Sequence, residues 1–326
     1  MKFRAWIAAV AILGICLQGL AAEGDKDYPA KPVKILVQYP PGGSPDFVAR
    51  VLAAKLSESL GQQFIVENRP GAGGNIATDL VAKSDPDGYT LLLAADPPIT
   101  MNPSLYAKLP FDPVKDLAPI TLAATSAFIM LAAPSFPANS VRELIALAKA
   151  NPGKFNFASS GTGGMHHLAG ELLNTRAGIR LVHIPYKGFG PGAIDVMSGK
   201  VEIMFGSVGA AVGHVKGGKL KALAILGSKR YAGLPQVPTA AEAGLPDFEI
   251  YAWMGLMAPA RTPRSIIDKL HVEAVKALRT KDAVDRFAAQ VLDIVAEGPQ
   301  EFAARISSDT PKWARIIKES GAKADD

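Results

Sequence analysis

The order of short apolar strands, glycine-rich loops and amphipathic helices is the feature of this sequence that most limits its fold. A β-branched run, Val33–Gln38, leads through a glycine-containing turn into Asp46–Leu60, whose apolar residues recur at helical spacing. Strands over Phe64–Glu67 and Tyr89–Ala94 follow, separated by a glycine-rich loop and a helix over residues 76–83. This strand–helix alternation predicts a mainly parallel sheet covered by helices.

The same pattern recurs further along the chain. The expected elements of this second module are a helix over Val141–Ala150, strands over Lys154–Ala158, Leu181–Ile184 and Val201–Phe205, and helices over Met165–Arg176 and up to Ser198. After Trp253 the pattern predicts helices alone, over Arg264–Leu278, Lys281–Val291, Pro299–Ile306 and Pro311–Glu319. The 326 residues suffice for two domains of ordinary size, so two α/β domains are expected.

The N-terminus predicts an export signal over residues 1–22. Lys2 and Arg4 precede the uncharged run Ala5–Leu20, and two alanines follow that run. The run is at or below the length that a membrane-spanning helix needs. The only cysteine, Cys16, lies inside the run rather than at its end, which argues against a lipid-modified N-terminus. We therefore expect a mature protein that is exported, soluble and free of disulfides.

Charge excludes one class of partner. The chain has 35 basic and 30 acidic residues, and loss of the predicted signal peptide leaves 33 basic residues against the same 30. An excess this small and this scattered is no footprint for nucleic acid. No nucleic-acid partner is expected.

Three glycine-rich loops follow predicted strands and precede predicted helices: Tyr39–Asp46, Gly71–Asn75 and Ser159–Gly164. Ligands of open parallel sheets bind where such loops and helix N-termini converge. Backbone N–H groups at a helix start suit a carboxylate or a phosphate. One loop of this kind could be a tight turn and nothing more, but three across two modules favour a shared anion site.

Motifs for catalysis are missing from the sequence. The glycine pair at 161 and 163 begins like a dinucleotide fingerprint, but His166 occupies the third glycine position. Neither a P-loop nor a nucleophile elbow around Ser160 or Ser207 is present. His166 and His167 are adjacent and would point about 100° apart on a helix, so they cannot chelate one metal ion together. We expect no enzyme activity, no metal and no cofactor.

A series of short segments, in order and without large gaps from about Tyr28 to Gly321, resembles the Bug family, the periplasmic solute-binding receptors of tripartite tricarboxylate transporters. The segments that carry the resemblance are Tyr39–Gly43 with Asp46 and Arg50, Val66–Asn75, Asp85–Leu92, Asn102–Tyr106, Pro110–Asp116, Ser159–Gly161 with His167, His183–Gly188, Pro238–Thr239 with Gly244, and Ala258–Pro259 with Pro263.

The resemblance implies a two-lobed, Venus-flytrap α/β fold of the type II periplasmic binding proteins, with two mixed or parallel sheets flanked by helices. Lobe 1 would comprise residues 23–124 and 253–326, and lobe 2 residues 125–252, with a hinge of two chain crossings. It further implies a periplasmic location, a small carboxylate as ligand, a membrane transporter as partner and a monomeric state.

Carried over position by position, the resemblance also implies a set of ligand contacts. In lobe 1 these are Tyr39, Gly43, Ser44, Gly74 and Asn75. In lobe 2 they are Ser160, Gly161, Thr162, Gly164 and His167, with Tyr186 and Lys187 lining the cleft. Asp96 and Ser207 stand at two further cleft positions where the family more often has, respectively, a small or hydroxyl residue and an aspartate.

For the following residues a structural role is expected or stays open. Asp46 is expected to cap its helix, and Arg50 and Arg69 to support loops. Lys187 either lines the cleft or is solvated, and Asp96 either faces the cleft or turns outward ahead of Pro97.

The departures at Gly164, Ser207 and Asp96 favour a ligand with one carboxylate and an aromatic or other bulky body. If Asp96 faces the cleft, its carboxylate would repel a second negative charge or pair with an amine. Two other functions stay open: a secreted hydrolase that uses the same cleft, and a receptor that feeds a sensor.

Overall fold

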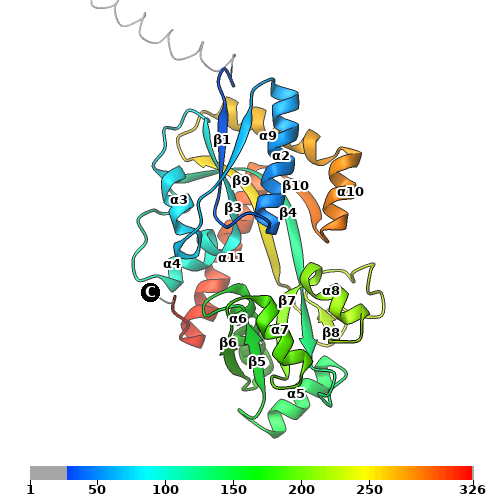
Figure 1. Ribbon diagram of the computed structural model, residues 1–326. Coiled ribbons are helices and arrows are strands. Elements are labelled where there is room, and N and C mark those ends of the chain that lie inside the picture. Colours follow the sequence, from blue (N-terminus) through cyan, green and yellow to red (C-terminus); the bar gives the residue numbers. More distant parts are fainter. Residues whose placement is uncertain (1–27, 325–326) are drawn as a thin grey trace, which may run out of the picture.

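The computed structural model describes residues 28–324, so the predicted signal peptide lies outside the described residues. The described chain forms two lobes with a long strand running through both (Figure 1). None of the helices in residues 28–324 combines the length and the apolar character needed to cross a membrane.

The first lobe is a mixed sheet with helices on both faces. Its strands, in spatial order, are β2 (Phe64–Asn68), β1 (Val33–Val37), β3 (Thr90–Ala95), β9 (Tyr251–Pro259), β4 (Leu117–Ala132) and β10 (Asp293–Glu297). One face carries α2 (Ser44–Leu60), α9 (Arg264–Leu278) and α10 (Lys281–Ala289), and the other carries α3 (Asn75–Ala82) and the beginning of α11 (Pro299–Ser320). In β1 and β3 successive side chains enter these two cores alternately, as the pleat of a strand requires.

The second lobe repeats this plan on a smaller scale. Its strands are β8 (Lys221–Ile225), the end of β4, β7 (Ile203–Ser207), β5 (Asn156–Ser159) and β6 (Val182–Pro185). Its helices are α5 (Val141–Ala150), α6 (Met165–Ala177), α7 (Phe189–Met197) and α8 (Val208–Lys216). The first lobe also has three short helical turns, η1 (Ala72–Gly74), η2 (Pro97–Met101) and α4 (Asn102–Leu105), and Figure 1 shows α4 on the side that faces the second lobe.

Strand β4 makes the two sheets continuous. From Leu117 to Ala127 it pairs with β9, and from Phe128 to Ala132 it pairs with β7 and β8, so that all ten strands form a single sheet. The sequence gives no sign of this strand, because Leu117–Ala132 is apolar and alanine-rich on both faces and shows no alternation. The domain boundaries at residues 124/125 and 252/253 stay a prediction.

Helix α11 contacts both lobes. Phe302 and Ile306 pack on the sheet of the first lobe, whereas Trp313, Ile316 and Ile317 join the core of the second. The prediction of two helices broken before Pro311 is wrong, since one helix runs through this proline. Pro311 is exposed, so water can hydrogen-bond to the carbonyl group that has lost its helical partner.

One further expectation is wrong, and one of the two interpretations of Asp96 is excluded. The tail after Trp253 is not helical throughout, because β9 and β10 belong to the sheet. Strand β9 is buried along almost its whole length, and therefore lacks the polar–apolar alternation of a half-exposed strand. The segment from Asp96 is not an outward turn, because η2 begins directly after Asp96 and the carboxyl group is buried.

We predict that Gly170→Ala destabilises the protein by about 1–3 kcal/mol, because a Cβ atom at this position of α6 would lie 2.5 Å from Cδ2 and Cζ of the buried Phe157 ring. Gly213→Ala in α8 is the matched control: no atom lies within 4 Å of the added Cβ, and helix propensity should stabilise the variant by up to about 1 kcal/mol. Urea unfolding measures both changes. Equal effects at the two sites would contradict the packing described for α6.

Candidate functional site

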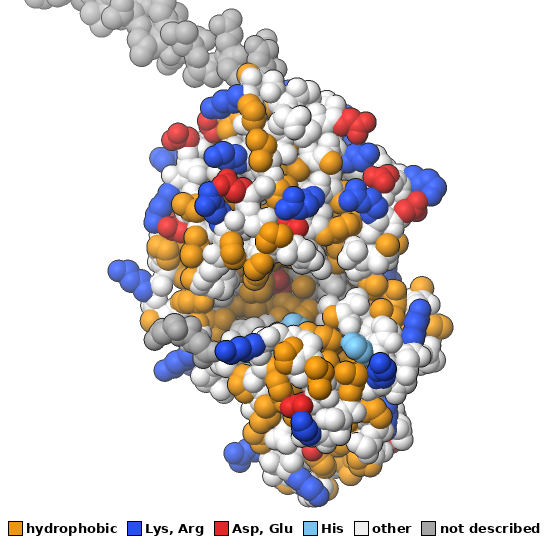
Figure 2. Space-filling model, in the orientation of Figure 1, with side chains coloured by type: hydrophobic (Ala, Val, Ile, Leu, Met, Phe, Trp, Pro, Cys, Tyr) orange, Lys and Arg blue, Asp and Glu red, His pale blue; other side chains and the backbone are white. Residues whose placement is uncertain are grey.

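A cavity of about 720 Å³ lies between the two lobes, and Figure 2 shows it as a hollow lined mainly by hydrophobic side chains. Its lobe 1 wall comes from the loop after β1 and from the end of β3, and its lobe 2 wall from the loop and helix start after β5. The apolar wall includes Leu105, Phe128 and Met165. No lysine or arginine is among the described residues that line this cavity. An anion held here would therefore depend on backbone groups and neutral side chains.

The start of helix α6 forms the lobe 2 wall. The loop after β5 turns sharply at Gly161 (φ +137°) and Gly163 (φ +76°), conformations that glycine adopts without strain. Gly164 is the N-cap residue and supplies no side-chain cap. The first amide groups of a helix have no acceptor within the helix and sit at the positive end of its dipole. Since residues 162–166 line the cavity, this helix start has the geometry predicted for an anion site.

Two histidines, His167 and His183, hold this loop in place. His167 accepts the N–H of Gly163 at Nδ1 (3.0 Å), and its ring stacks on that of His183 at 3.8 Å. His183 Nε2 lies 2.6 Å from Oγ of Ser159, which also donates to the carbonyl of Gly161 (3.0 Å). His167 is buried and does not line the cavity, although the resemblance implied a ligand contact. Its visible role is to fix the loop.

A serine–histidine pair lies in the cavity wall. Oγ of Ser160 and Nδ1 of His166 are 2.6 Å apart, and both residues line the cavity. The sequence has no nucleophile elbow around Ser160, and its motifs did not predict this nucleophile–base geometry. Burial lowers the pKa of His166 to about 4, and no carboxylate in residues 28–324 bonds to its other ring nitrogen. The pair therefore lacks the carboxylate that orients the base in a catalytic triad.

The loop after β1 carries its own anion. Asp46 accepts hydrogen bonds from Nε and Nη2 of Arg50 (both 2.9 Å), from Asn68 (2.9 Å) and from the N–H of Gly42 (3.0 Å). The bond to Arg50 is the main reason that the pKa of Asp46 is lowered to about 2. As predicted, Arg50 supports this loop. Because the carboxylate of Asp46 already occupies the helix start, the N-terminus of α2 is a weaker anion site than that of α6.

The third predicted loop, Gly71–Asn75, is covered only at its end: residues 71–73 are exposed, whereas Gly74 and Asn75 are buried. A Cβ on Gly74 would lie 2.5 Å from Cγ of Pro98, and Asn75 Oδ1 accepts from Nδ2 of Asn102 at 2.7 Å. Of this loop only Gly73 lines the cavity. The three loops thus do not contribute equally, and the loop of α6 is the principal one.

The predicted site residues separate into two groups. Those that line the cavity are Tyr39, Gly43, Asp96, Ser160, Thr162 and Gly164. Those that do not line it are Ser44, Gly74, Asn75, Gly161, His167, Tyr186, Lys187 and Ser207. For all of them, direct contact with a ligand stays a prediction.

Three residues of the second group have other roles in the structure. The hydroxyl of Tyr186 donates to Asp195 (2.9 Å), Ser207 caps α8 by accepting the N–H of Ala210 (3.3 Å), and Lys187 is exposed.

Several lining residues were missed. They are Asn102, Leu105, Tyr106, Phe128, His166, Ala252 and Ala324, among others. The segment Asn102–Tyr106 belongs to the series that carried the resemblance, so its motif could have been assigned to the cleft. Phe128 lies on β4, and no assignment was possible without that strand.

Asp96 is the one acidic residue among the described residues that line the cavity, and Figure 2 shows an acidic side chain at the back of the hollow. Its side chain is 2% exposed, and its Oδ2 atom has no hydrogen-bond partner within residues 28–324. Burial, and secondly the carboxylate of Asp309 on α11, raise the pKa of Asp96 well above its usual value. Asp309 itself accepts from Nε1 of Trp253 (3.3 Å). The interpretation of Asp96 as an outward turn residue is wrong.

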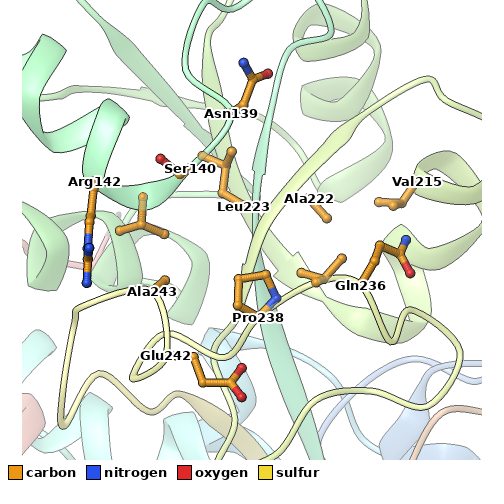
Figure 3. A pocket seen from close by; sticks show the side chains of 12 residues that line it. Asn139, Ser140, Arg142, Val215, Ala222, Leu223, Gln236, Pro238, Glu242 and Ala243 are labelled. Atoms are coloured by element: carbon orange, nitrogen blue, oxygen red, sulfur yellow. The ribbon is translucent and has the colours of Figure 1, made fainter.

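A smaller cavity of about 390 Å³ lies in the second lobe, away from the cleft (Figure 3). Two of its polar side chains already bond to neighbours. Asn139 accepts from Lys221 (2.9 Å), and Glu242 accepts from Arg230 (2.7 Å) and from the N–H of Thr239 (2.8 Å). Nothing in this pocket points to a ligand.

Comparison with known proteins agrees with this geometry. A family model described as "Tripartite tricarboxylate transporter family receptor" matches residues 48–322. Protein BugT of Bordetella pertussis is 40% identical over 318 residues, which is 96% of this chain and 98% of that protein. The fold prediction is confirmed by the periplasmic binding protein BugD, whose structure is 34% identical with a TM-score of 0.74, covering 91% of this chain and 99% of that one.

Two similar structures are named with ligands. A protein of R. palustris with adipate has a TM-score of 0.78 and 30% identity over 91% of this chain and 99% of its own. MatC from Rhodopseudomonas palustris with bound malate has a TM-score of 0.74 and 31% identity over 89% of this chain and 100% of its own.

We predict that His166 makes the protein less stable in acid. Because its pKa falls from 6.5 in the unfolded chain to about 4 in the folded one, the unfolded state binds the proton first as pH drops. The stability present above pH 6.5 should be lost progressively down to pH 4, by at most about 3 kcal/mol. His166→Asn should flatten this part of the pH profile of urea unfolding. An unchanged slope in the variant would refute the assignment.

Proposed function

The chain belongs to the tripartite tricarboxylate transporter receptor family, and we propose that it is a periplasmic receptor that captures a small carboxylate between its lobes and delivers it to a membrane transporter. The observation that carries this proposal is the uncapped start of α6 in the wall of the interlobe cavity. Backbone N–H groups and the helix dipole can hold a carboxylate there without a lysine or arginine. The two similar structures with adipate and with malate support a carboxylate as the ligand class.

The apolar lining bears on the shape of the ligand. Leu105, Phe128 and Met165, together with several prolines, offer more hydrophobic surface than a small hydroxy-acid can cover. We infer a ligand with one carboxylate at the start of α6 and a bulky or aromatic body. Burial of that body would contribute about 25 cal/mol per Å² of apolar surface.

A hydrolase is the second candidate, and the bond between Ser160 and His166 is the observation that favours it. Attack by a serine hydroxyl needs a histidine that is basic near neutral pH. The lowered pKa of His166 disfavours proton transfer from Ser160. Turnover of nitrophenyl esters that Ser160→Ala abolishes would establish the hydrolase instead.

We expect a thermal-shift screen of carboxylates to identify ligands. A ligand at 100 times its dissociation constant should add about 2.7 kcal/mol to the free energy of unfolding. Substituted benzoates and branched monocarboxylates should stabilise the protein more than citrate at equal concentration, because the cavity offers apolar surface and no side-chain cation. A strong shift with citrate and none with aromatic acids would exclude the inferred ligand shape while leaving the carboxylate receptor intact.

We further predict that Gly164→Pro weakens carboxylate binding by about tenfold or more, because it removes one amide donor at the start of α6. The φ angle of Gly164, −73°, is one that proline adopts, so the substitution suits the backbone of this residue. Gly164→Ala keeps the donor and places its Cβ 3.7 Å from the nearest atom outside its chain neighbours, so its affinity should change little. Lys187→Ala should also leave affinity almost unchanged. Calorimetric affinities of the three variants test this order, and equal losses for Gly164→Pro and Lys187→Ala would transfer the role to the lysine.

A further inference from the structure

Asp96 and the start of α6 make the two walls of the interlobe cavity electrostatically different. The lobe 2 wall is the positive end of α6, whereas the back of the lobe 1 wall holds Asp96, with Asp309 behind it. Asp96 differs in one respect from Asp46, which lies in the first turn of α2 and is not among the lining residues. Asp46 is neutralised by Arg50, but no lysine, arginine or histidine lies within ion-pair distance of Asp96 in residues 28–324.

A buried carboxyl group without a cation is costly, and a protein tolerates it only if a proton or a cationic partner neutralises it. Within residues 28–324 the Oδ2 atom of Asp96 has no hydrogen-bond partner, and the N–H groups near this carboxyl group are those of Asp96 itself and Trp253. The wall of the cavity therefore carries a buried carboxyl group that has no cationic partner within residues 28–324.

We propose that Asp96 is a specificity-determining residue that binds a protonated amine of the ligand, so that the receptor selects amino carboxylates. The carboxylate of such a ligand would lie at the start of α6, and its ammonium group at Asp96. This inference rests on the proposed function, because it takes the site at α6 as given. It adds the chemistry of the opposite end of the ligand, where charge complementarity gives specificity.

Proton linkage follows from this arrangement. Burial and Asp309 raise the pKa of Asp96, which favours neutralisation of the carboxyl group by a proton. An ammonium group takes over that role on binding, Asp96 ionises, and its proton passes to the buffer. Binding of an amino carboxylate should therefore release a proton and become tighter as pH rises, as long as the ligand amine stays protonated.

Other groups near Asp96 must be separated from this effect. The titratable and charged groups around it are Asp309, Arg305 and Lys312 on α11, Tyr39 after β1, and His166 across the cavity. His166 titrates near pH 4, and burial and Asp96 raise the pKa of Tyr39 above its usual value, so neither changes charge around neutrality. The variant Asp309→Asn removes the other buried carboxyl group, so that its effect on binding can be distinguished from the effect of Asp96.

The test uses ligands that differ only in their terminal group. Hexanoate, 5-aminopentanoate and adipate end the same chain with a methyl, an ammonium or a carboxylate group. 4-Ethylbenzoate, 4-(aminomethyl)benzoate and 4-(carboxymethyl)benzoate form the aromatic counterpart. Calorimetry in two buffers of different ionisation enthalpy, at about pH 5.5 and about pH 8, gives both affinity and protons released.

In at least one triplet the ammonium member should bind tightest to the wild type and release a proton. Asp96→Asn should weaken that member by about thirtyfold and abolish proton release, while the methyl member changes little and the carboxylate member gains. Asp309→Asn should keep the preference for the ammonium member. Asp285→Asn, at an exposed ion pair with Lys281, controls for the loss of an acidic residue as such.

Three results would overturn the inference. In the first, carboxylates bind but the ammonium member has no advantage in either triplet, in which case the proposed function stands. In the second, the dicarboxylate binds tightest, weakens as pH rises and is retained by Asp96→Asn, which would make Asp96 a protonated hydrogen-bond donor. In the third, no carboxylate of the triplets or the wider screen stabilises the protein, and the proposed function then fails as well. The pH arm uses the wild type, so the test does not depend on the folding of a variant.

Discussion

The pairing of β4 with β9 is the interaction on which the rest of the structure depends. These two antiparallel strands run side by side from Leu117 to Ala127, and they carry the chain into the second lobe and back again. The helices of the first lobe pack on the sheet that they complete, and β7 and β8 extend the same β4 strand into the second lobe. Because one strand serves both sheets, the two walls of the cavity are positioned by a single hydrogen-bonded element.

The cavity between these walls relies on groups that the sequence composition does not reveal. Its positive end is a helix start exposed by a glycine-rich turn, and no lysine or arginine is among the described residues that line the cavity. This loop is fixed by the stacked rings of His167 and His183 and by the hydroxyl of Ser159. Preorganised donors of this kind lose little conformational freedom when a ligand arrives, and this favours affinity.

Local signals in the sequence were sufficient for much of the fold. The strand–loop–helix units at both walls have the predicted order, because alternating periodicity and glycine turns mark them. Strands β4 and β9 were missed, since a strand buried on both faces has no periodicity to detect. The helix through Pro311 was missed because a proline usually ends such a pattern. Tertiary packing against both lobes outweighs that local preference.

The site was predictable only where a motif touches the cavity directly. The loop Ser159–Gly164 could be assigned from its glycines and the helix that follows. The burial of Asp96 could not, because it depends on Asp309 and Trp253, more than 150 residues away in the sequence. Likewise, the adjacent histidines diverge as expected, but which of them reaches the cavity is decided by the packing of His167 against His183.

Helix α11 has a mechanical consequence for any movement of the lobes. It is a third connection between the lobes and lies beside β4 and β9, which run from one lobe to the other. Ile306 packs on the first lobe and Trp313 on the second. A rotation of the lobes about the two strands must therefore bend this helix or shear one of its ends along its groove. Pro311 falls between the two points of attachment, where the helix lacks one hydrogen bond and its bending stiffness is lowest. The proline places a flexible joint in this helix, so any rotation of the lobes would be limited by an element that contributes no side chain to the described lining of the cavity.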